Sequence, residues 1–174
     1  MKFKYIIAAI STVLLASIAT HSFPTGNHAG GHPDSQAIGK PGKAADAKRT
    51  ITVNMLDTMR FNPQSIKVKQ GETIKFIVKN SGKVKHEMVL GTEKELKEHA
   101  EVMKQNPEME HADENQITVQ PGSSGEIIWQ FTKSGKVNFA CLQPGHYEAG
   151  MKGAIVVGSK SSGDSPAHDS AHKH

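Results

Sequence analysis

Apolar and polar residues alternate along seven short stretches of the chain. These stretches are residues 51–55, 66–68, 74–78, 86–90, 117–119, 127–131 and 137–141. Such alternation is typical of strands that bury one face. A last apolar run covers residues 154–157, and turn-forming pairs such as Gln70-Gly71 and Pro121-Gly122 separate several of the stretches. Seven or eight short strands in about 110 residues predict an all-β protein, a Greek-key β-sandwich with antiparallel strands.

One segment interrupts the β pattern. Thr92 is followed three residues later by Glu95, which is the spacing of a capping box at a helix start. Apolar residues then recur at helical spacing at positions 96, 100 and 103, and Pro107 ends the run. The sequence therefore predicts one short helical insertion in the β-sandwich.

The first residues have the pattern of an export signal. Lysines at positions 2 and 4 precede an uncharged apolar stretch over residues 6–19, and small residues follow it. The apolar stretch is shorter than the ~20 residues that a membrane-spanning helix needs. We predict a signal peptide over residues 1–22 that is cleaved, which gives a periplasmic protein with no membrane attachment.

Two further segments show no apolar periodicity. Residues 23–48 and 160–174 are rich in Gly, Pro, Ser, Ala and His, a composition typical of flexible segments. We predict a flexible leader over 23–48, a folded domain over 49–159 and a disordered tail over 160–174. Histidines in these two ends are candidates for capturing additional metal. They are His28, His32, His168, His172 and His174.

Composition excludes several classes of function. The chain of 174 residues has one Cys, which rules out a disulfide framework, a four-thiolate iron–sulfur cluster and a multi-Cys zinc site. A net charge of +4 without a basic stripe does not indicate nucleic-acid binding. An unpaired thiol in an exported protein is a liability unless it has a role.

The segment after the last alternating stretch offers that role. Cys141, His146 and Met151 lie within eleven residues, and His86 begins an earlier stretch. Two imidazoles, one thiolate and a weak thioether are the ligand set of a blue-copper electron-transfer site. Pro144 and Gly145 favour a tight turn that would bring the loop histidine back toward the cysteine. Zinc could use the same donors but prefers a closed site without a thioether.

Residues 49–159 resemble the cupredoxins over nearly their whole length. The Cys-x4-His-x4-Met spacing is similar to the ligand loops of rusticyanin and auracyanin. The segments DTMRFNP (57–63), KHEMVLG (85–91) and GHYEAGMKG (145–153) are similar to the periplasmic copper-tolerance cupredoxins, the CopI-like group. The resemblance implies one type 1 copper ion per chain, with His86, Cys141 and His146 as equatorial ligands and Met151 as the axial ligand.

One position departs from the common cupredoxin pattern. Many small blue-copper proteins have Asn directly after the first His, where it braces the ligand loop, whereas this chain has Glu87. The backbone N–H of Glu87 can still serve the cysteine sulfur, but an ionised carboxylate only accepts hydrogen bonds. The redox potential and colour of the site therefore do not follow from the resemblance.

The sequence predicts a one-electron copper protein rather than an enzyme, because no catalytic constellation and no second histidine cluster accompanies the site. Three roles fit it. The first is copper tolerance, by binding copper and cycling it between Cu(I) and Cu(II). The second is electron transfer as a soluble monomer, with a partner docking at the edge of His146 among Leu142, Pro144 and Tyr147.

The third role is copper storage or delivery through methionines and the histidine-rich ends. Met55, Met88 and Met103 fall on predicted core faces, which argues against a store. Met109 and His111 are more exposed by pattern and are candidates for weak metal binding.

Overall fold

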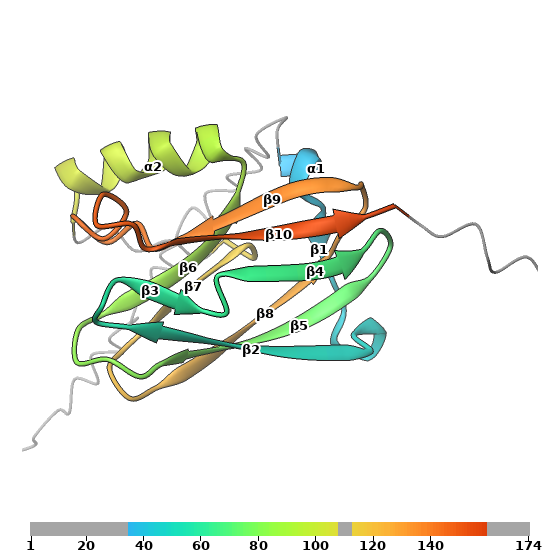
Figure 1. Cartoon of the computed structure of the whole chain (residues 1–174), viewed down its shortest axis with the longest axis horizontal. Helices are drawn as coiled ribbons and strands as arrows, with labels where there is room; N and C mark the ends of the chain where they lie inside the picture. Colours follow the sequence, from blue (N-terminus) through green and yellow to red (C-terminus); the bar gives the residue numbers. More distant parts are fainter. Residues whose placement is uncertain (1–34, 108–112, 160–174) are drawn as a thin grey trace, which may run out of the picture. The chain divides into compact units, whose positions relative to one another are not determined.

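The computed structural model describes residues 35–107 and 113–159, which form two five-stranded sheets (Figure 1). The first sheet has the strand order β1 (Lys40–Pro41), β8 (Ser124–Gln130), β5 (Thr73–Asn80), β2 (Arg49–Leu56) and β3 (Arg60–Asn62). The second sheet has the order β4 (Ser65–Lys69), β10 (Lys152–Gly158), β9 (Gly135–Ala140), β6 (His86–Gly91) and β7 (Gln116–Val119).

A single hydrophobic core lies between the two sheets and explains the alternation. On β5 the side chains of Ile74, Phe76 and Val78 are fully buried, while Lys79 faces solvent. Residues of both sheets belong to the same buried cluster, and Phe61 of β3 meets Phe139 of β9 edge to face, with ring centroids 5.0 Å apart. The predicted β-sandwich is confirmed.

The structure has more strands than the sequence predicts. The eight predicted strands correspond to β2, β4, β5, β6, β7, β8, β9 and β10. The additional strands β1 and β3 have two and three residues, which is too short for an alternation to be visible. Ten strands therefore replace the predicted seven or eight in the described part of the chain.

The expectation that all strands are antiparallel is wrong for two pairs. β2 pairs with β5, and β4 with β10, in parallel. After the β2–β3 hairpin the chain crosses to β4 in the other sheet and returns to β5, so β5 runs in the direction of β2. Alternation shows which face of a strand is buried but carries no information on strand direction.

The predicted flexible leader over residues 23–48 is wrong from residue 35 onward. The short helix α1 (Ser35–Ile38) places Ile38 in the core at 2% exposure, and the Trp129 indole donates to the Ile38 carbonyl at 2.8 Å. Strand β1 then pairs with β8, and a 3-10 turn, Ala44–Asp46, leads into β2. One apolar side chain and a few backbone hydrogen bonds order this segment, and neither produces a periodic sequence signal.

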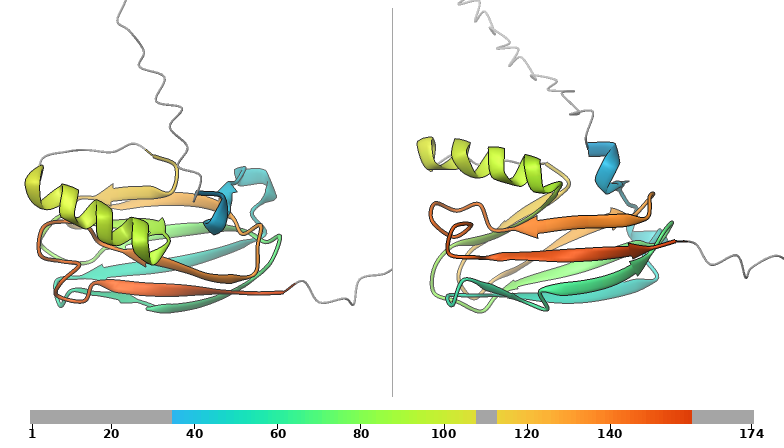
Figure 2. Two further views of the ribbon diagram at one scale, coloured as in Figure 1. Left: turned by 90° about the horizontal axis from the view of Figure 1, so that it is seen from above. Right: turned by 45° about the horizontal axis from the view of Figure 1, so that its top comes forward.

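The predicted helical insertion is α2 (Glu93–Gln105). Thr92 caps it as expected: its Oγ1 accepts from the Glu95 N–H at 3.2 Å, and its N–H donates to the Glu95 carboxylate at 2.8 Å. The helix lies along the end of the domain that carries the β9–β10 loop (Figure 2). Its buried residues Leu96, Ala100 and Met103 form a second apolar cluster with Val89, Ala140 and Leu142.

Several predictions concern residues outside the described ranges. These are the signal peptide over 1–22, the tail over 160–174, the end histidines, and the pair Met109 and His111. Within the described ranges, the helices are too short or too polar to cross a membrane.

Candidate metal centre

Three predicted ligands meet at one end of the second sheet. His86 is the first residue of β6, and Cys141 directly follows β9. The antiparallel pairing of β6 with β9, with Val89 opposite Ala140, carries His86 to the start of the segment that connects β9 to β10. We call residues 141–151 the ligand loop, and it also contains His146 and Met151.

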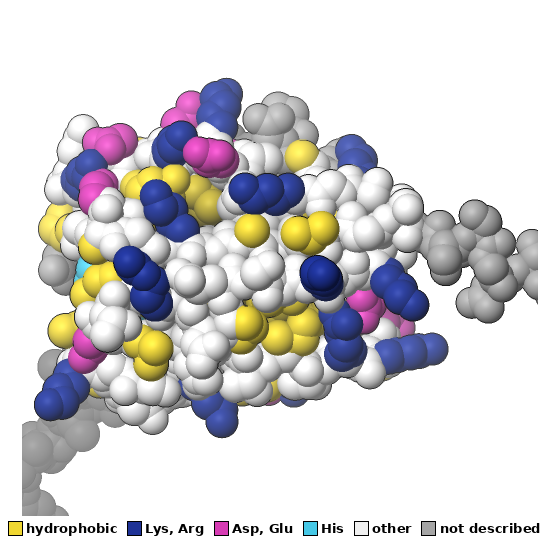
Figure 3. Space-filling model, in the orientation of Figure 1, with side chains coloured by type: hydrophobic (Ala, Val, Ile, Leu, Met, Phe, Trp, Pro, Cys, Tyr) yellow, Lys and Arg dark blue, Asp and Glu magenta, His cyan; other side chains and the backbone are white. Residues whose placement is uncertain are grey.

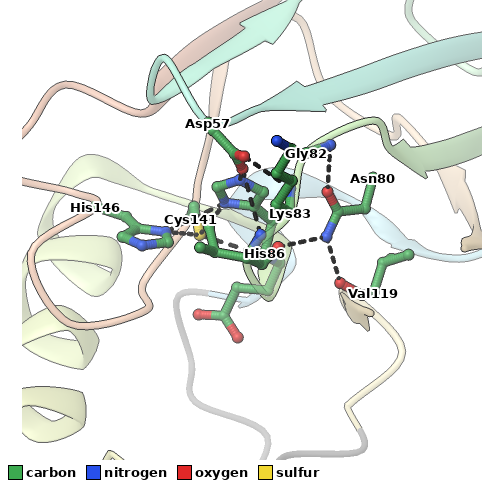
Figure 4. A network of polar contacts seen from close by, with 10 residues as sticks. Asp57, Asn80, Gly82, Lys83, His86, Val119, Cys141 and His146 are labelled. Atoms are coloured by element: carbon green, nitrogen blue, oxygen red, sulfur yellow. Dashed lines mark hydrogen bonds and ion pairs between the residues drawn. The ribbon is translucent and has the colours of Figure 1, made fainter. Parts of the chain in front are cut away.

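The donor atoms of His86, Cys141 and His146 all lie within 4.8 Å of one another. The Cys141 Sγ is 3.2 Å from the His146 Nδ1 and 3.9 Å from the His86 Nδ1. The two Nδ1 atoms are 3.2 Å apart. The rings thus turn their Nδ1 atoms toward a common point beside the sulfur, as expected for side chains that share one metal ion (Figure 4).

Met151, at the other end of the ligand loop, is fully buried and bonded through its backbone to Cys141 and His146. Its carbonyl accepts from the Cys141 N–H at 3.1 Å, and its own N–H donates to the His146 carbonyl at 3.0 Å. These backbone bonds close the ligand loop on itself, so that both sulfur-containing residues are in the main core cluster. The structure therefore brings together the donor atoms of three predicted site residues, and backbone bonds tie the fourth, Met151, to the same loop.

The turn predicted at Pro144 and Gly145 is present. Gly145 has a φ of +83°, a conformation that other residues rarely adopt, and the His146 N–H donates to the Gln143 carbonyl at 2.9 Å. Arg60 on β3 holds the far side of the loop, because its guanidinium donates to the Ala149 carbonyl at 2.9 Å. The loop conformation is thus fixed by bonds to its own backbone and to a neighbouring strand.

Burial controls the protonation of the site. It raises the pKa of the Cys141 thiol to about 12, although the N–H of Glu87, 3.4 Å from the sulfur, acts in the opposite direction. Burial, and then the neighbouring His86, lower the pKa of His146. Without a cation the cysteine is therefore a thiol, and a metal that binds there must displace its proton.

This donor set fits copper. A thiolate and a thioether are soft ligands that favour Cu(I), and imidazoles suit copper in both oxidation states. His86, Cys141 and Met151 are each fully buried, so water is largely kept from the metal position. The chemistry of the residues present therefore fits a copper ion.

Glu87 braces the ligand loop, a role that sequence reasoning missed. The expected bond from its backbone N–H to the cysteine sulfur is present at 3.4 Å. Its buried carboxylate also accepts from the Leu142 N–H at 2.9 Å and from the Gln143 amide at 3.3 Å. The departure from Asn therefore keeps the brace, with carboxylate oxygens as the acceptors.

Asp57 is the second residue that sequence reasoning missed. Its Oδ1 lies 3.1 Å from the His86 Nε2, on the side of the ring that faces away from the cysteine. The backbone N–H of Lys83 donates to its other oxygen at 2.7 Å and is the main cause that lowers the pKa of Asp57. The sequence pointed to Asp57 only because it begins the segment 57–63, which resembles the CopI-like group. That resemblance assigned no role to Asp57.

The surface near His146 differs in one respect from the prediction. Leu142 is 1% exposed and packs under α2, so it is no part of a docking surface. Pro144 is exposed, and Tyr147 is half-buried with the Lys152 ammonium 4.3 Å from its ring centroid. In the space-filling view, histidine surface appears among apolar side chains at the left edge, the end that carries the ligand loop (Figure 3).

In the described ranges, the methionines outside the site lie in the core or pack against it. Met55, Met88 and Met103 are buried, as predicted for core residues. Met59 is half-buried and packs against the main core.

Comparisons with known proteins agree with this geometry. Residues 47–158 match the family described as copper-binding proteins of the plastocyanin/azurin family. The copper-resistant cuproprotein CopI of Rubrivivax gelatinosus is 53% identical over 132 residues, which cover 75% of this chain and 80% of that protein. CopI of Pseudomonas aeruginosa is 38% identical over 151 residues, covering 70% of this chain and 83% of that protein.

Solved structures of auracyanins are similar in fold. Reduced auracyanin from Roseiflexus castenholzii has a TM-score of 0.54 at 25% identity, covering 64% of this chain and 98% of its own. Auracyanin B has a TM-score of 0.56 at 22% identity, covering 68% of this chain and 95% of its own.

Proposed function

The chain belongs to the plastocyanin/azurin family of copper-binding proteins, in its CopI group, and we propose that it is a periplasmic type 1 copper protein that supports copper tolerance. The observation that carries the proposal is the meeting of a buried thiol with two imidazole nitrogens within 4.8 Å. Relatives named copper-resistant cuproproteins support the physiological role.

We assign one copper ion per chain to His86, Cys141 and His146, with Met151 as the axial ligand. Bound there, copper supplies one-electron exchange between Cu(I) and Cu(II). The chain contributes donors that already converge, a thiol that would release its proton to solvent when a metal binds, and a ligand loop closed by its own backbone bonds. Little of the protein has to move when the charge of the site changes.

We propose electron exchange rather than substrate turnover because of the way the site is enclosed. His86, Cys141 and Met151 are fully buried, and the half-buried His146 is the ligand that reaches toward the surface. An electron can pass through an imidazole edge, whereas a substrate would need an open coordination position at the metal.

Electron transfer to a partner protein is the second candidate, favoured by the same exposed edge of His146. The exposed Pro144 and the half-buried Tyr147 flank it. A redox partner would dock there with a small interface, since weak redox encounters bury little area. We propose that the protein acts as a monomer in either role.

Growth on rising copper separates the two roles. A deletion strain is complemented with the wild type, with Cys141→Ser, or with a protein lacking residues 159–174. Copper tolerance through the site predicts a copper-sensitive deletion strain that wild type and the truncated protein rescue and Cys141→Ser does not. A deletion strain that grows equally well on copper contradicts the tolerance role and favours the electron carrier.

Copper content tests storage as an alternative. We expect one tightly bound copper per purified chain, with an intense visible band that Cys141→Ser removes, since that band needs a copper–thiolate bond. Several tightly bound coppers per chain would instead indicate a storage or delivery protein. A band that survives in Cys141→Ser would contradict the type 1 assignment itself.

A further inference from the structure

The edge of the His86 ring that points away from Cys141 contacts the carboxylate of Asp57. Nδ1 of this ring points toward Cys141 and His146, whereas Nε2 lies 3.1 Å from Asp57 Oδ1 (Figure 4). His86 is fully buried, so the carboxylate takes the place that water would have beside an exposed ring. Asp57 comes from the turn between β2 and β3, far from the ligand loop in the sequence.

The segment between β5 and β6 is shaped to hold this carboxylate. Lys83 and Val84 donate their backbone N–H groups to it, at 2.7 Å and 3.4 Å. A Cβ added to Gly82 would overlap Asp57 Oδ1, so the backbone approaches the carboxylate as closely as a glycine allows.

Asn80, 2% exposed, fixes the same segment from the other side. Its amide donates to the carbonyls of Val84 and Val119, at 2.8 Å and 2.9 Å, and its oxygen accepts from the Gly82 N–H at 2.9 Å. We call residues 80–84, with Asp57, the carboxylate cradle. Residues 80–84 end two positions before His86.

The cradle determines which nitrogen of His86 carries the proton. An ionised carboxylate can only accept hydrogen bonds, so the neutral imidazole must present N–H at Nε2. The lone pair is then on Nδ1, the atom that faces the cysteine sulfur at 3.9 Å. The carboxylate also makes the imidazole a more basic ligand, as in carboxylate–histidine–zinc triads.

We propose that Asp57 is a positioning residue that sets the tautomer of His86 and stabilises the Cu(II) form of the site relative to Cu(I). The inference deepens the proposed function and rests on it, because it takes His86 as a copper ligand. Its physical basis is that a fixed negative charge and a more basic imidazole favour the more highly charged ion.

Asp57→Asn is the direct test. The amide oxygen can replace Oδ1 opposite His86 and Val84, but the amide nitrogen then faces the Lys83 N–H, and the charge is lost. We expect the ratio of Cu(II) to Cu(I) affinity to fall about tenfold, as for other partners of metal-ligating histidines. For a one-electron couple this is a rise of about 59 mV in reduction potential.

Glu148→Gln is the matched control. Glu148 lies two residues from His146 and also loses one negative charge, but its carboxylate pairs with Lys104 and contacts no ligand. The proposal predicts a potential closer to wild type in this variant than in Asp57→Asn. Equal shifts in the two variants, or no shift in Asp57→Asn, would overturn it.

A second measurement needs no copper. Nitrogen-15 NMR of the apo-protein at a pH where imidazoles are neutral reports the tautomer of His86. We expect Nε2–H in the wild type and a larger share of Nδ1–H in Asp57→Ala, which has no acceptor. Gly82→Ala, which displaces the carboxylate, should change the His86 signal in the same direction. A wild-type His86 with its proton on Nδ1 would overturn the inference.

The potential measurement and the NMR measurement together distinguish a failure of this inference from a failure of the proposed function. A wild-type protein that shows no copper–thiolate band refutes the proposed function, whatever the tautomer. A wild type that binds copper normally, with a potential insensitive to Asp57→Asn, leaves the function intact and refutes the role of Asp57.

Discussion

The two histidines of the metal centre are held in different ways. His86 is fully buried at the start of β6, and its outer nitrogen is bound to a carboxylate that backbone N–H groups hold in turn. His146 is half-buried on the ligand loop, and its Nδ1 contacts Cys141 and His86 on the inner side. His86 is therefore held in place by hydrogen bonds on its outer side, whereas His146 lies between the donor cluster and the surface.

The difference shows how one small domain meets two demands. A copper ion that exchanges electrons needs ligands that stay in place, which the β6 side supplies through Asp57 and Glu87. It also needs a contact with the outside, which the ligand loop supplies through His146. We therefore expect substitutions around His86 and substitutions in the ligand loop to have different effects.

The largest effect is expected when each histidine is replaced with glycine. Both variants should lose the wild-type copper spectrum, because each loses a ligand. Added imidazole should restore it in His146→Gly, where the cavity opens at the surface, at a concentration at least about tenfold lower than in His86→Gly, whose site is enclosed. Titration of each copper-loaded variant with imidazole, followed by visible absorption, measures this. Equal imidazole requirements would show that the two sides are equally accessible.

Leu142→Ala removes packing between the ligand loop and α2 and leaves the surroundings of His86 unchanged. Leu142 is 1% exposed and fixes the start of the ligand loop in the apolar cluster under α2. Removing its side chain should lower the free energy of unfolding by about 2–5 kcal/mol, as for other buried leucines. Urea unfolding of the apo-protein measures the loss. Val102→Ala, at a position of α2 that is 44% exposed, is the control and should change it by less than about 0.5 kcal/mol.

The status of Leu142 illustrates what sequence patterns reveal. It follows Cys141 in a segment without periodicity, so the sequence placed it on the surface, and only the packing of α2 shows that it is buried. Cys141 and His146 could be grouped from the sequence because they lie five residues apart, in one loop. Seven of the eight longer strands were predictable from their alternation, and β10 from a short apolar run.

The parts that sequence reasoning missed depend on contacts between distant positions. Asp57 and His86 are 29 residues apart, and Glu87 and Leu142 are 55 apart. A single hydrogen bond between such positions leaves no periodic trace in either segment. Strand β1 likewise owes its place to pairing with β8 rather than to a pattern in its own two residues.

Glu87→Ala tests the connection between the two sides. The carboxylate on β6 accepts from the Leu142 N–H and the Gln143 amide, and its removal leaves these buried donors without an acceptor. We expect a loss of about 1–3 kcal/mol in unfolding free energy and faster hydrogen exchange at the Leu142 amide. Glu87→Gln keeps an acceptor oxygen and should lose less. Unchanged exchange at Leu142 in Glu87→Ala would show that the brace does not hold the loop.

The smallest effect is expected where the ligand loop meets α2 at the surface. The Lys104 ammonium is 2.7 Å from the Glu148 carboxylate, and both side chains are well exposed. This bond, as the largest cause, lowers the pKa of Glu148, so any stabilisation is present above its ordinary pKa of 4.5 and is lost as the pH falls below that value.

Because water and salt screen an exposed pair, Lys104→Ala should leave the melting temperature at neutral pH and about 0.15 M salt nearly unchanged. A small decrease should appear only at low ionic strength, and it should disappear on acidification. Lys104 also pairs with Glu101 at 2.7 Å, so Glu101→Gln is the control. A large loss in Lys104→Ala at neutral pH that persists in high salt, and that Glu101→Gln does not reproduce, would mean that α2 holds the ligand loop through the Lys104–Glu148 pair. The apolar cluster around Leu142 would then no longer be the main attachment of the loop, and the loop side of the centre would be supported by charge rather than by packing.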